Sequence, residues 1–137
     1  MKIAFVDTDI MLDYLLKREP FFEDALNLMN AGARGRVKLA ISVMTVANLI
    51  YFLRKKFTVK ETQQKLKVLR TFVDVPTTDS HAIDEMLNSN FSDLEDALQH
   101  ATAKQAKADV LITRNAEDYK RASIAIMNAG EFLKVLK

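Results

Sequence analysis

Acidic and other oxygen-bearing side chains stand at three separate places in the sequence that could meet at one site. Two of these places directly follow short apolar runs, and the third is the first turn of an expected helix. The residues are Asp7 and Asp9, then Asp93 and Asp96, and finally Thr113, Asn115 and Asp118. Carboxylates held close together repel one another, so gathering them is costly unless a cation is bound. The pattern therefore predicts a cation site made of oxygen ligands.

Mg²⁺ or Mn²⁺ is the cation that suits such ligands. The chain contains no cysteine and only two histidines, His81 and His100, so a zinc site is a poor match. His100 lies four residues after Asp96, although a histidine bonded to a structural partner is the more common case. Bound divalent ions, best as a pair about 4 Å apart, suit phosphodiester hydrolysis because they activate water and neutralise charge in the transition state.

Structural roles are open alternatives for several of these acids. Asp93 and Asp96 would also favour the helix dipole in a first helical turn. Asp118 follows Asn115 with the spacing of a capping box. Asp7 ends an apolar run abruptly, which a purely structural role explains less readily.

The remaining charged residues give weaker signals. Asp9 and Asp13 are better explained as capping or solvating the first helix. Basic clusters at 17–18, 34–38 and 54–56 could follow a phosphate backbone, but solvated helix faces account for them equally well. The net charge of +2 neither requires nor excludes a polyanionic partner.

Strands and helices are expected to alternate along the chain. Short apolar runs predict five strands, at 3–6, 37–41, 72–75, 110–112 and 124–126. Apolar residues with helical spacing predict helices at 10–16, 22–29, 45–55, 58–69, 82–87, 93–107 and 128–136. Capping boxes are expected at Thr58–Glu61, Asn128–Glu131 and Ser92–Glu95, with Ser92 as the helix cap.

This alternation predicts an α/β protein with a doubly wound parallel sheet, in which ligands bind outside the carboxyl ends of the strands. With no visible linker or repeat, residues 1–137 are expected to form a single domain. The first acid, Asp7, follows too few apolar residues for a signal peptide or a membrane span. We therefore expect a cytoplasmic protein that does not enter the membrane, and the absence of cysteine agrees with this.

Three segments taken together resemble the PIN domain family. They are 3–12 (IAFVDTDIML), 93–99 (DLEDALQ) and 110–119 (VLITRNAEDY). The motifs occur in the order and at the spacing of the family, and the resemblance covers the whole chain. It implies a PIN-like sheet flanked by helices and a Mg²⁺- or Mn²⁺-dependent endoribonuclease. It also implies the toxin of a toxin–antitoxin pair, with an RNA substrate, an antitoxin partner and a homodimeric state.

The resemblance also implies roles for individual residues. Asp7 would be the first metal ligand, and Asp96 would be the acid on the later helix. Asn115 and Asp118 would form the polar pair after the fourth strand. Thr113 would orient that loop or a bound water.

Two positions depart from the family pattern. Asn48 stands where the family usually carries glutamate, and Asn115 stands where aspartate is common. An amide still offers a carbonyl oxygen, so Asn48 remains a candidate ligand, but it supplies no negative charge and metal affinity should fall. Asp93 could serve as an additional acid near the mouth of the site.

Two other functions remain open. A weakened PIN-like module that binds RNA or a protein partner without cleavage is the main alternative, and Asn48 and Asn115 favour it. A haloacid-dehalogenase-type phosphatase is the second, because Asp7-Thr8-Asp9 after an apolar run resembles the nucleophile motif of that family. The chain is short for that fold and lacks its acidic motif after a late strand.

Overall fold

A five-stranded parallel sheet forms the centre of the molecule in the computed structural model, which describes residues 1–136. The strands are β1 (Ile3–Val6), β2 (Lys38–Ala40), β3 (Val73–Asp74), β4 (Val110–Ile112) and β5 (Ala125–Met127). Their order across the sheet is β3-β2-β1-β4-β5, and every neighbouring pair is parallel. The chain therefore turns outward in opposite directions from β1, which confirms the expected doubly wound α/β sheet.

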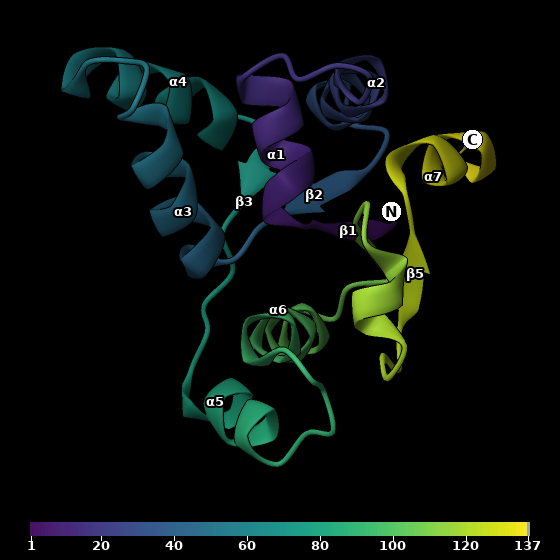
Figure 1. Cartoon of the computed structure of the whole chain (residues 1–137). Helices are drawn as coiled ribbons and strands as arrows, with labels where there is room; N and C mark the ends of the chain where they lie inside the picture. Colours follow the sequence, from purple (N-terminus) through teal and green to yellow (C-terminus); the bar gives the residue numbers. More distant parts are fainter. Residues whose placement is uncertain (137) are drawn as a thin grey trace.

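Within residues 1–136, seven α-helices and one 3-10 helix surround the sheet. They are α1 (Thr8–Leu15), α2 (Phe22–Ala33), α3 (Val43–Leu53), α4 (Val59–Arg70), α5 (Ser80–Leu87), α6 (Leu94–Gln105), η1 (Ala116–Tyr119) and α7 (Ala129–Val135). Figure 1 shows α1 and α2 on one side of the sheet and α5 and α6 on the other, with α3 and α4 paired at one edge. The sheet is thus covered on both faces, as parallel sheets require.

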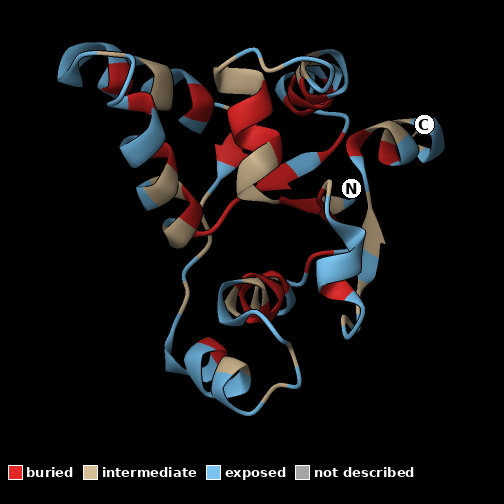
Figure 2. Cartoon of the chain, in the orientation of Figure 1, coloured by how far each residue is buried: buried red, intermediate tan, exposed pale blue. Residues whose placement is uncertain are grey.

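The two faces of the sheet bury different parts of the core. Ala4 and Val6 belong to the larger apolar cluster with α1 and α2, whereas Phe5 belongs to a smaller cluster with Leu111 and Tyr119. This follows from the alternation of side chains along a strand. Figure 2 shows the buried residues concentrated in the strands and on the inner sides of α1, α2 and α6.

Side chains fix several helix starts. The predicted capping boxes at Thr58 and Asn128 are both present. The prediction that Ser92 caps the helix over 93–107 is wrong, because Asp93 accepts hydrogen bonds from the backbone amides of the second and third helical residues and the helix begins at Leu94. Asn115 makes no side-chain cap at η1.

Candidate active site

Asp7 lies at the carboxyl end of β1, in the middle of the sheet, and caps α1. Because Val6 is paired with Ile112, Asp7 and Thr113 become neighbours directly beyond the ends of their strands. The Thr113 hydroxyl donates to Asp7 Oδ2 over 2.8 Å, and the Thr8 backbone amide donates to Asp7 Oδ1 over 2.8 Å. Burial raises the pKa of the Asp7 carboxyl, and these donors oppose the increase.

Asp96 lies in the first turn of α6 and shares a neighbour with Asp7, the Tyr119 hydroxyl. This hydroxyl is 3.5 Å from Asp7 Oδ2 and 3.4 Å from Asp96 Oδ1. Burial, followed by the charges of Asp93, Asp7 and Asp118, raises the pKa of Asp96 to about 7. Burial also raises the pKa of Tyr119, so the phenol remains a neutral donor between the two acids.

A pocket of about 200 Å³ opens over Asp7 and Asp96. Its other lining residues come from α1, α3, α6 and the loop after β4, and they are Thr8, Asp9, Met44, Asn48, Glu95, Gln99 and Asn115. The Asn115 side-chain amide donates to Asp9 Oδ2 over 3.2 Å. Four segments that are distant in sequence therefore meet at one polar pocket, and Asn48 and Asn115 both line it.

Gln99 links the floor of this pocket to α3. Its side-chain amide donates to Thr45 Oγ1 over 3.0 Å and to Asp7 Oδ1 over 3.3 Å. Thr45 is fully buried, and its hydroxyl also shares a hydrogen bond of 2.9 Å with the Thr8 hydroxyl. The buried side of Asp7 is thus surrounded by neutral donors.

Among the residues that the structure describes, neither Asp7 nor Asp96 has a cationic partner. All ion pairs found within residues 1–136 involve other side chains.

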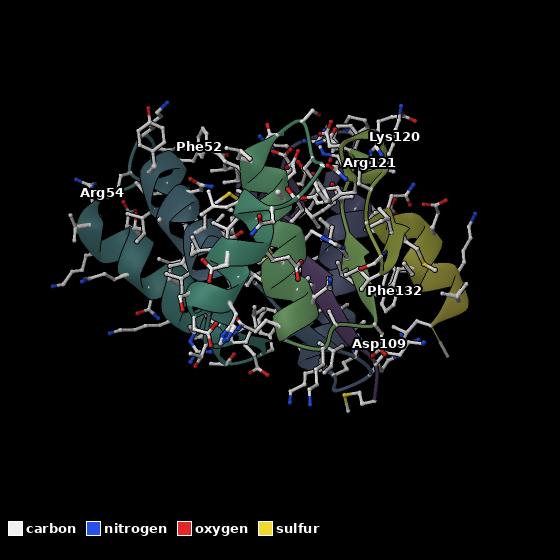
Figure 3. The ribbon with its side chains drawn as sticks, turned by 90° about the horizontal axis from the view of Figure 1, so that it is seen from below. Phe52, Arg54, Asp109, Lys120, Arg121 and Phe132 are labelled. Carbon is white, nitrogen blue, oxygen red and sulfur yellow. The ribbon has the colours of Figure 1, made fainter. Side chains whose placement is uncertain are left out.

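Figure 3 shows Lys120 and Arg121 at the opposite end of the molecule from Asp109, which precedes β4. These two basic residues therefore lie toward the carboxyl ends of the strands, at the same end as the pocket.

The predicted ligands do not all gather in one cluster. Asp118 lines a neighbouring hollow and not the pocket of Asp7, although its charge contributes to the raised pKa of Asp96. Asp93 is the cap of α6, in agreement with its structural interpretation. Within the part of the chain that the structure describes, no group of three or more His, Cys, Asp or Glu side chains could hold a metal ion. Asp7 and Asp96 share the pocket with two further carboxylates, Asp9 and Glu95, and with the amide groups of Asn48, Gln99 and Asn115.

Two residues near the candidate site in sequence have purely internal contacts. His100 is buried, and its Nε2 accepts a hydrogen bond of 3.0 Å from the Ser123 backbone amide, which confirms the structural interpretation. Asp13 was expected to cap or solvate the first helix, and this is wrong. It is fully buried and paired with Arg18 and Arg114 over 2.9 and 3.0 Å, because α1 turns this face toward the core.

Gln99 and Tyr119 contact the acids but were not predicted as site residues. Gln99 lies three residues after Asp96 on the same helix face, so its spacing carried a usable signal. Tyr119 ends η1, and its contact with both acids depends on how that turn packs against α6. No spacing rule predicts such a contact.

The fold and the pocket together define an α/β protein with an acidic site at the carboxyl end of a parallel sheet. The sequence profile of the PIN domain matches residues 4–117, which is most of the chain. The chain therefore belongs to the PIN domain family. Membership of this family leaves the phosphatase alternative without support. Comparison with curated proteins gives no match.

Solved structures with the same fold include a chain of a toxin–antitoxin complex and chains of two DNA-bound complexes. A chain of a toxin-antitoxin complex from Klebsiella pneumoniae is similar with a TM-score of 0.69 and 21% identity, over 92% of this chain and 97% of that chain. A chain of DNA-bound VapBC from Salmonella typhimurium has a TM-score of 0.67 and 16% identity, over 94% of this chain and 99% of that chain. A chain of VapBC2 from Rickettsia felis, bound to a promoter DNA fragment, has a TM-score of 0.64 and 19% identity, over 92% of this chain and 97% of that chain. At these identities the similarity shows the fold alone.

A helix that spans a membrane must be both long and apolar. Among residues 1–136, no helix is both long enough and apolar enough to span a bilayer.

Proposed function

We propose that this chain is a Mg²⁺- or Mn²⁺-dependent endoribonuclease that acts as the toxin of a toxin–antitoxin pair in the cytoplasm. The observation that carries the proposal is the meeting of Asp7 and Asp96 at one pocket without a cationic partner. Burial raises the pKa of both carboxyls. A divalent cation would compensate their negative charge and return both groups to the ionised form.

The donor set suits Mg²⁺ or Mn²⁺. Mg²⁺ is usually held by one or two carboxylates, together with waters and the phosphates of the substrate. Asp7 and Asp96 would supply the two carboxylates, and the side chains of Asn48 and Asn115 line the same pocket. We propose Asp118 as an outer ligand, because its charge reaches Asp96 from the neighbouring hollow. A third inner carboxylate is not required by this donor set.

Each residue of the pocket would have a definite task. Thr113 and Gln99 hold the carboxylate of Asp7 in one orientation through the hydrogen bonds described above. Tyr119 would offer a neutral hydroxyl to the carboxylates of Asp7 and Asp96, which lie 3.5 and 3.4 Å from it. Asp93 fixes the first turn of α6 that carries Asp96. When bound, a divalent ion supplies charge neutralisation for the phosphodiester and activation of the attacking water.

We also propose an antitoxin partner and a homodimeric state. The antitoxin proposal is supported by the fold relatives, which include a chain of a toxin–antitoxin complex. The homodimer proposal is supported by exposed apolar side chains on α3, namely Val43 (59% exposed), Ile50 (44%) and Tyr51 (61%). Light scattering of the purified chain tests the dimer: a mass near 15.5 kDa would contradict it.

A PIN module that binds RNA or protein without cleavage is the second candidate. Asn48 and Asn115 line the pocket as amides, and Asn115 directs its NH₂ group at Asp9. Two positions where the family often has acids thus add no negative charge here. We favour the nuclease because Asp7 and Asp96 are both retained and both lack a cationic partner.

Cleavage assays separate the two candidates. Purified protein is incubated with single-stranded and structured RNAs in Mg²⁺, Mn²⁺ or EDTA, alongside the variants Asp7→Asn and Asp96→Asn. The nuclease proposal expects cutting that requires a divalent ion and disappears in both variants. Asp84→Asn serves as the matched control, since Asp84 is exposed and lies on α5. Cutting that persists in EDTA or in Asp7→Asn would come from a contaminant, and RNA binding without cutting would favour the second candidate.

A further inference from the structure

Asp13 and two arginines form a buried ionic cluster next to the candidate site. The side chain of Asp13 is 0% exposed, whereas those of Arg18 and Arg114 are 36% and 26% exposed. Arg18 Nε donates to Asp13 Oδ1 over 2.9 Å. Arg114 Nε is 3.0 Å from Asp13 Oδ2, and its NH₂ group is 3.3 Å from Oδ1. The guanidinium of Arg114 also stacks on Phe21, 3.9 Å from the ring centroid.

The cluster joins three segments of the chain that build the pocket. Asp13 belongs to α1, the helix that Asp7 caps. Arg18 follows α1 and donates to the backbone carbonyl of Asp9 over 3.1 Å, with a second contact of 3.5 Å to Asp9 Oδ1. Arg114 belongs to the loop after β4. Through the contacts of Arg18 and Arg114, the carboxylate of Asp13 therefore connects the start of α1, the end of α1 and the loop after β4.

Arg114 lies between the two loop residues that contact the acids of the pocket. Thr113 donates to Asp7, and Asn115 donates to Asp9. The Asn115 backbone amide also donates to Thr113 Oγ1 over 3.0 Å. Alternate residues of the loop therefore hold pocket acids, and the residue between them is anchored on buried Asp13.

Stability alone is a weak explanation for this arrangement. Removing charged groups from water offsets most of the attraction between them, and apolar replacements of buried ion pairs are often neutral or stabilising. Arg114, in contrast, donates one hydrogen bond to Asp13 Oδ1 through its NH₂ group, and its Nε forms a 3.0 Å ion pair with Oδ2 that lacks hydrogen-bond geometry. Its planar guanidinium is oriented by this hydrogen bond together with the stacking on Phe21. A geometric role fits these contacts better.

We propose that Asp13, Arg18 and Arg114 form a clamp that positions Thr113, Asn115 and Asp9 around the pocket. Arg114 and Asp13 are positioning residues, since they act on the site through other side chains. The inference rests on the proposed function for its link to metal binding. The positioning of the loop can be measured independently of that function.

The test compares Arg114→Lys with Arg36→Lys in the full chain. Lysine keeps the charge of Arg114 but loses the planar fork. Arg36 is an exposed arginine just before β2, at the opposite end of the strands from the pocket, and so makes a matched control. Three quantities are measured: amide hydrogen exchange at Asn115 and at Leu111 of β4, Mn²⁺ affinity by calorimetry, and the thermal midpoint.

In Arg114→Lys, the clamp predicts exchange at Asn115 that is several-fold faster, with unchanged exchange at Leu111. Mn²⁺ affinity should fall about tenfold, as is typical when an outer partner of a ligand is altered, while the thermal midpoint stays near that of wild type. Arg36→Lys should change none of these. Asp13→Asn tests the same clamp from the other side and should accelerate exchange at Asn115 in the same way.

Three results would overturn the clamp. They are unchanged exchange at Asn115, equal acceleration at Leu111 that reveals general destabilisation, and unchanged Mn²⁺ affinity in a variant whose loop has loosened. If the wild-type protein binds no Mn²⁺ at all, the proposed function fails, while the exchange at Asn115 still decides whether the loop is clamped.

Discussion

Replacing Asp96 with asparagine should stabilise the metal-free protein increasingly as the pH rises. The pKa of Asp96 lies at about 7 in the folded protein, against an ordinary value of 3.8. Because the folded pKa is raised, the native state binds a proton that the unfolded chain releases. The stability associated with this proton is fully present below about pH 4 and is lost as the pH rises through about 7. An asparagine side chain has no such dependence.

The pKa difference sets the size of this effect. A carboxyl group with a folded pKa of about 7 rather than 3.8 disfavours the native state by about 4 kcal/mol once it is ionised. Asp96 is only partly buried, so solvent screening reduces the usable figure, and we expect about 1–2 kcal/mol. The advantage of Asp96→Asn over wild type should therefore grow by about that amount between about pH 4.5 and about pH 8.

Urea unfolding in EDTA at both pH values measures this difference. Asp84→Asn is the control, because it removes an exposed carboxylate from α5 and should show no comparable change with pH. Adding Mn²⁺ at about 100 times its Kd should stabilise wild type by about 2.7 kcal/mol and should leave Asp96→Asn almost unaffected. If Asp96→Asn and Asp84→Asn differ from wild type by the same amount at both pH values, the repulsion argument is refuted.

Three further substitutions test other parts of the structure. Thr113→Val removes the hydroxyl that donates to Asp7 and should lower the free energy of unfolding by about 1–3 kcal/mol, measured by urea denaturation. Phe5→Ala empties a fully buried position and should cost about 3–5 kcal/mol; a cost below about 1 kcal/mol in thermal unfolding would contradict the assignment of Phe5 to the core. Asn48→Glu adds a carboxylate to the pocket and should tighten Mn²⁺ binding in calorimetry, and weaker binding would count against Asn48 as a ligand.

The position of Asp7 could be predicted because the signal is local. Four apolar residues ending at an acid indicate a buried strand whose next residue lies at a sheet edge. The parallel fold then brings the residues after β1 and β4 to the same edge. The direct contact between Asp7 and Thr113 depends on β1 and β4 being neighbours in register, and the sequence pattern does not specify strand order.

The features that the sequence did not reveal have a different physical origin. Asp13 was expected to cap or solvate the first helix, yet it is buried and paired with two arginines from later segments, Arg18 and Arg114. Asp118 lines a hollow beside the pocket of Asp7, and its charge still acts on Asp96. The burial of Asp13 and the place of Asp118 both depend on tertiary contacts between segments, which spacing along one segment cannot reveal.

The distribution of arginines separates the two kinds of buried carboxylate in this protein. Asp7 caps α1 and Asp13 lies in the second half of the same helix, and burial is the largest influence on the pKa of each. Asp13 is paired with two arginines, as a buried charge requires when nothing else will neutralise it. Asp7 and Asp96 receive only hydroxyl and amide donors, although Arg18 and Arg114 lie on adjoining segments. The fold therefore pairs Asp13 with two arginines but leaves Asp7 and Asp96 without a cation, so the negative charge of the pocket stays available. A bound divalent cation is the partner that such a pocket would accept.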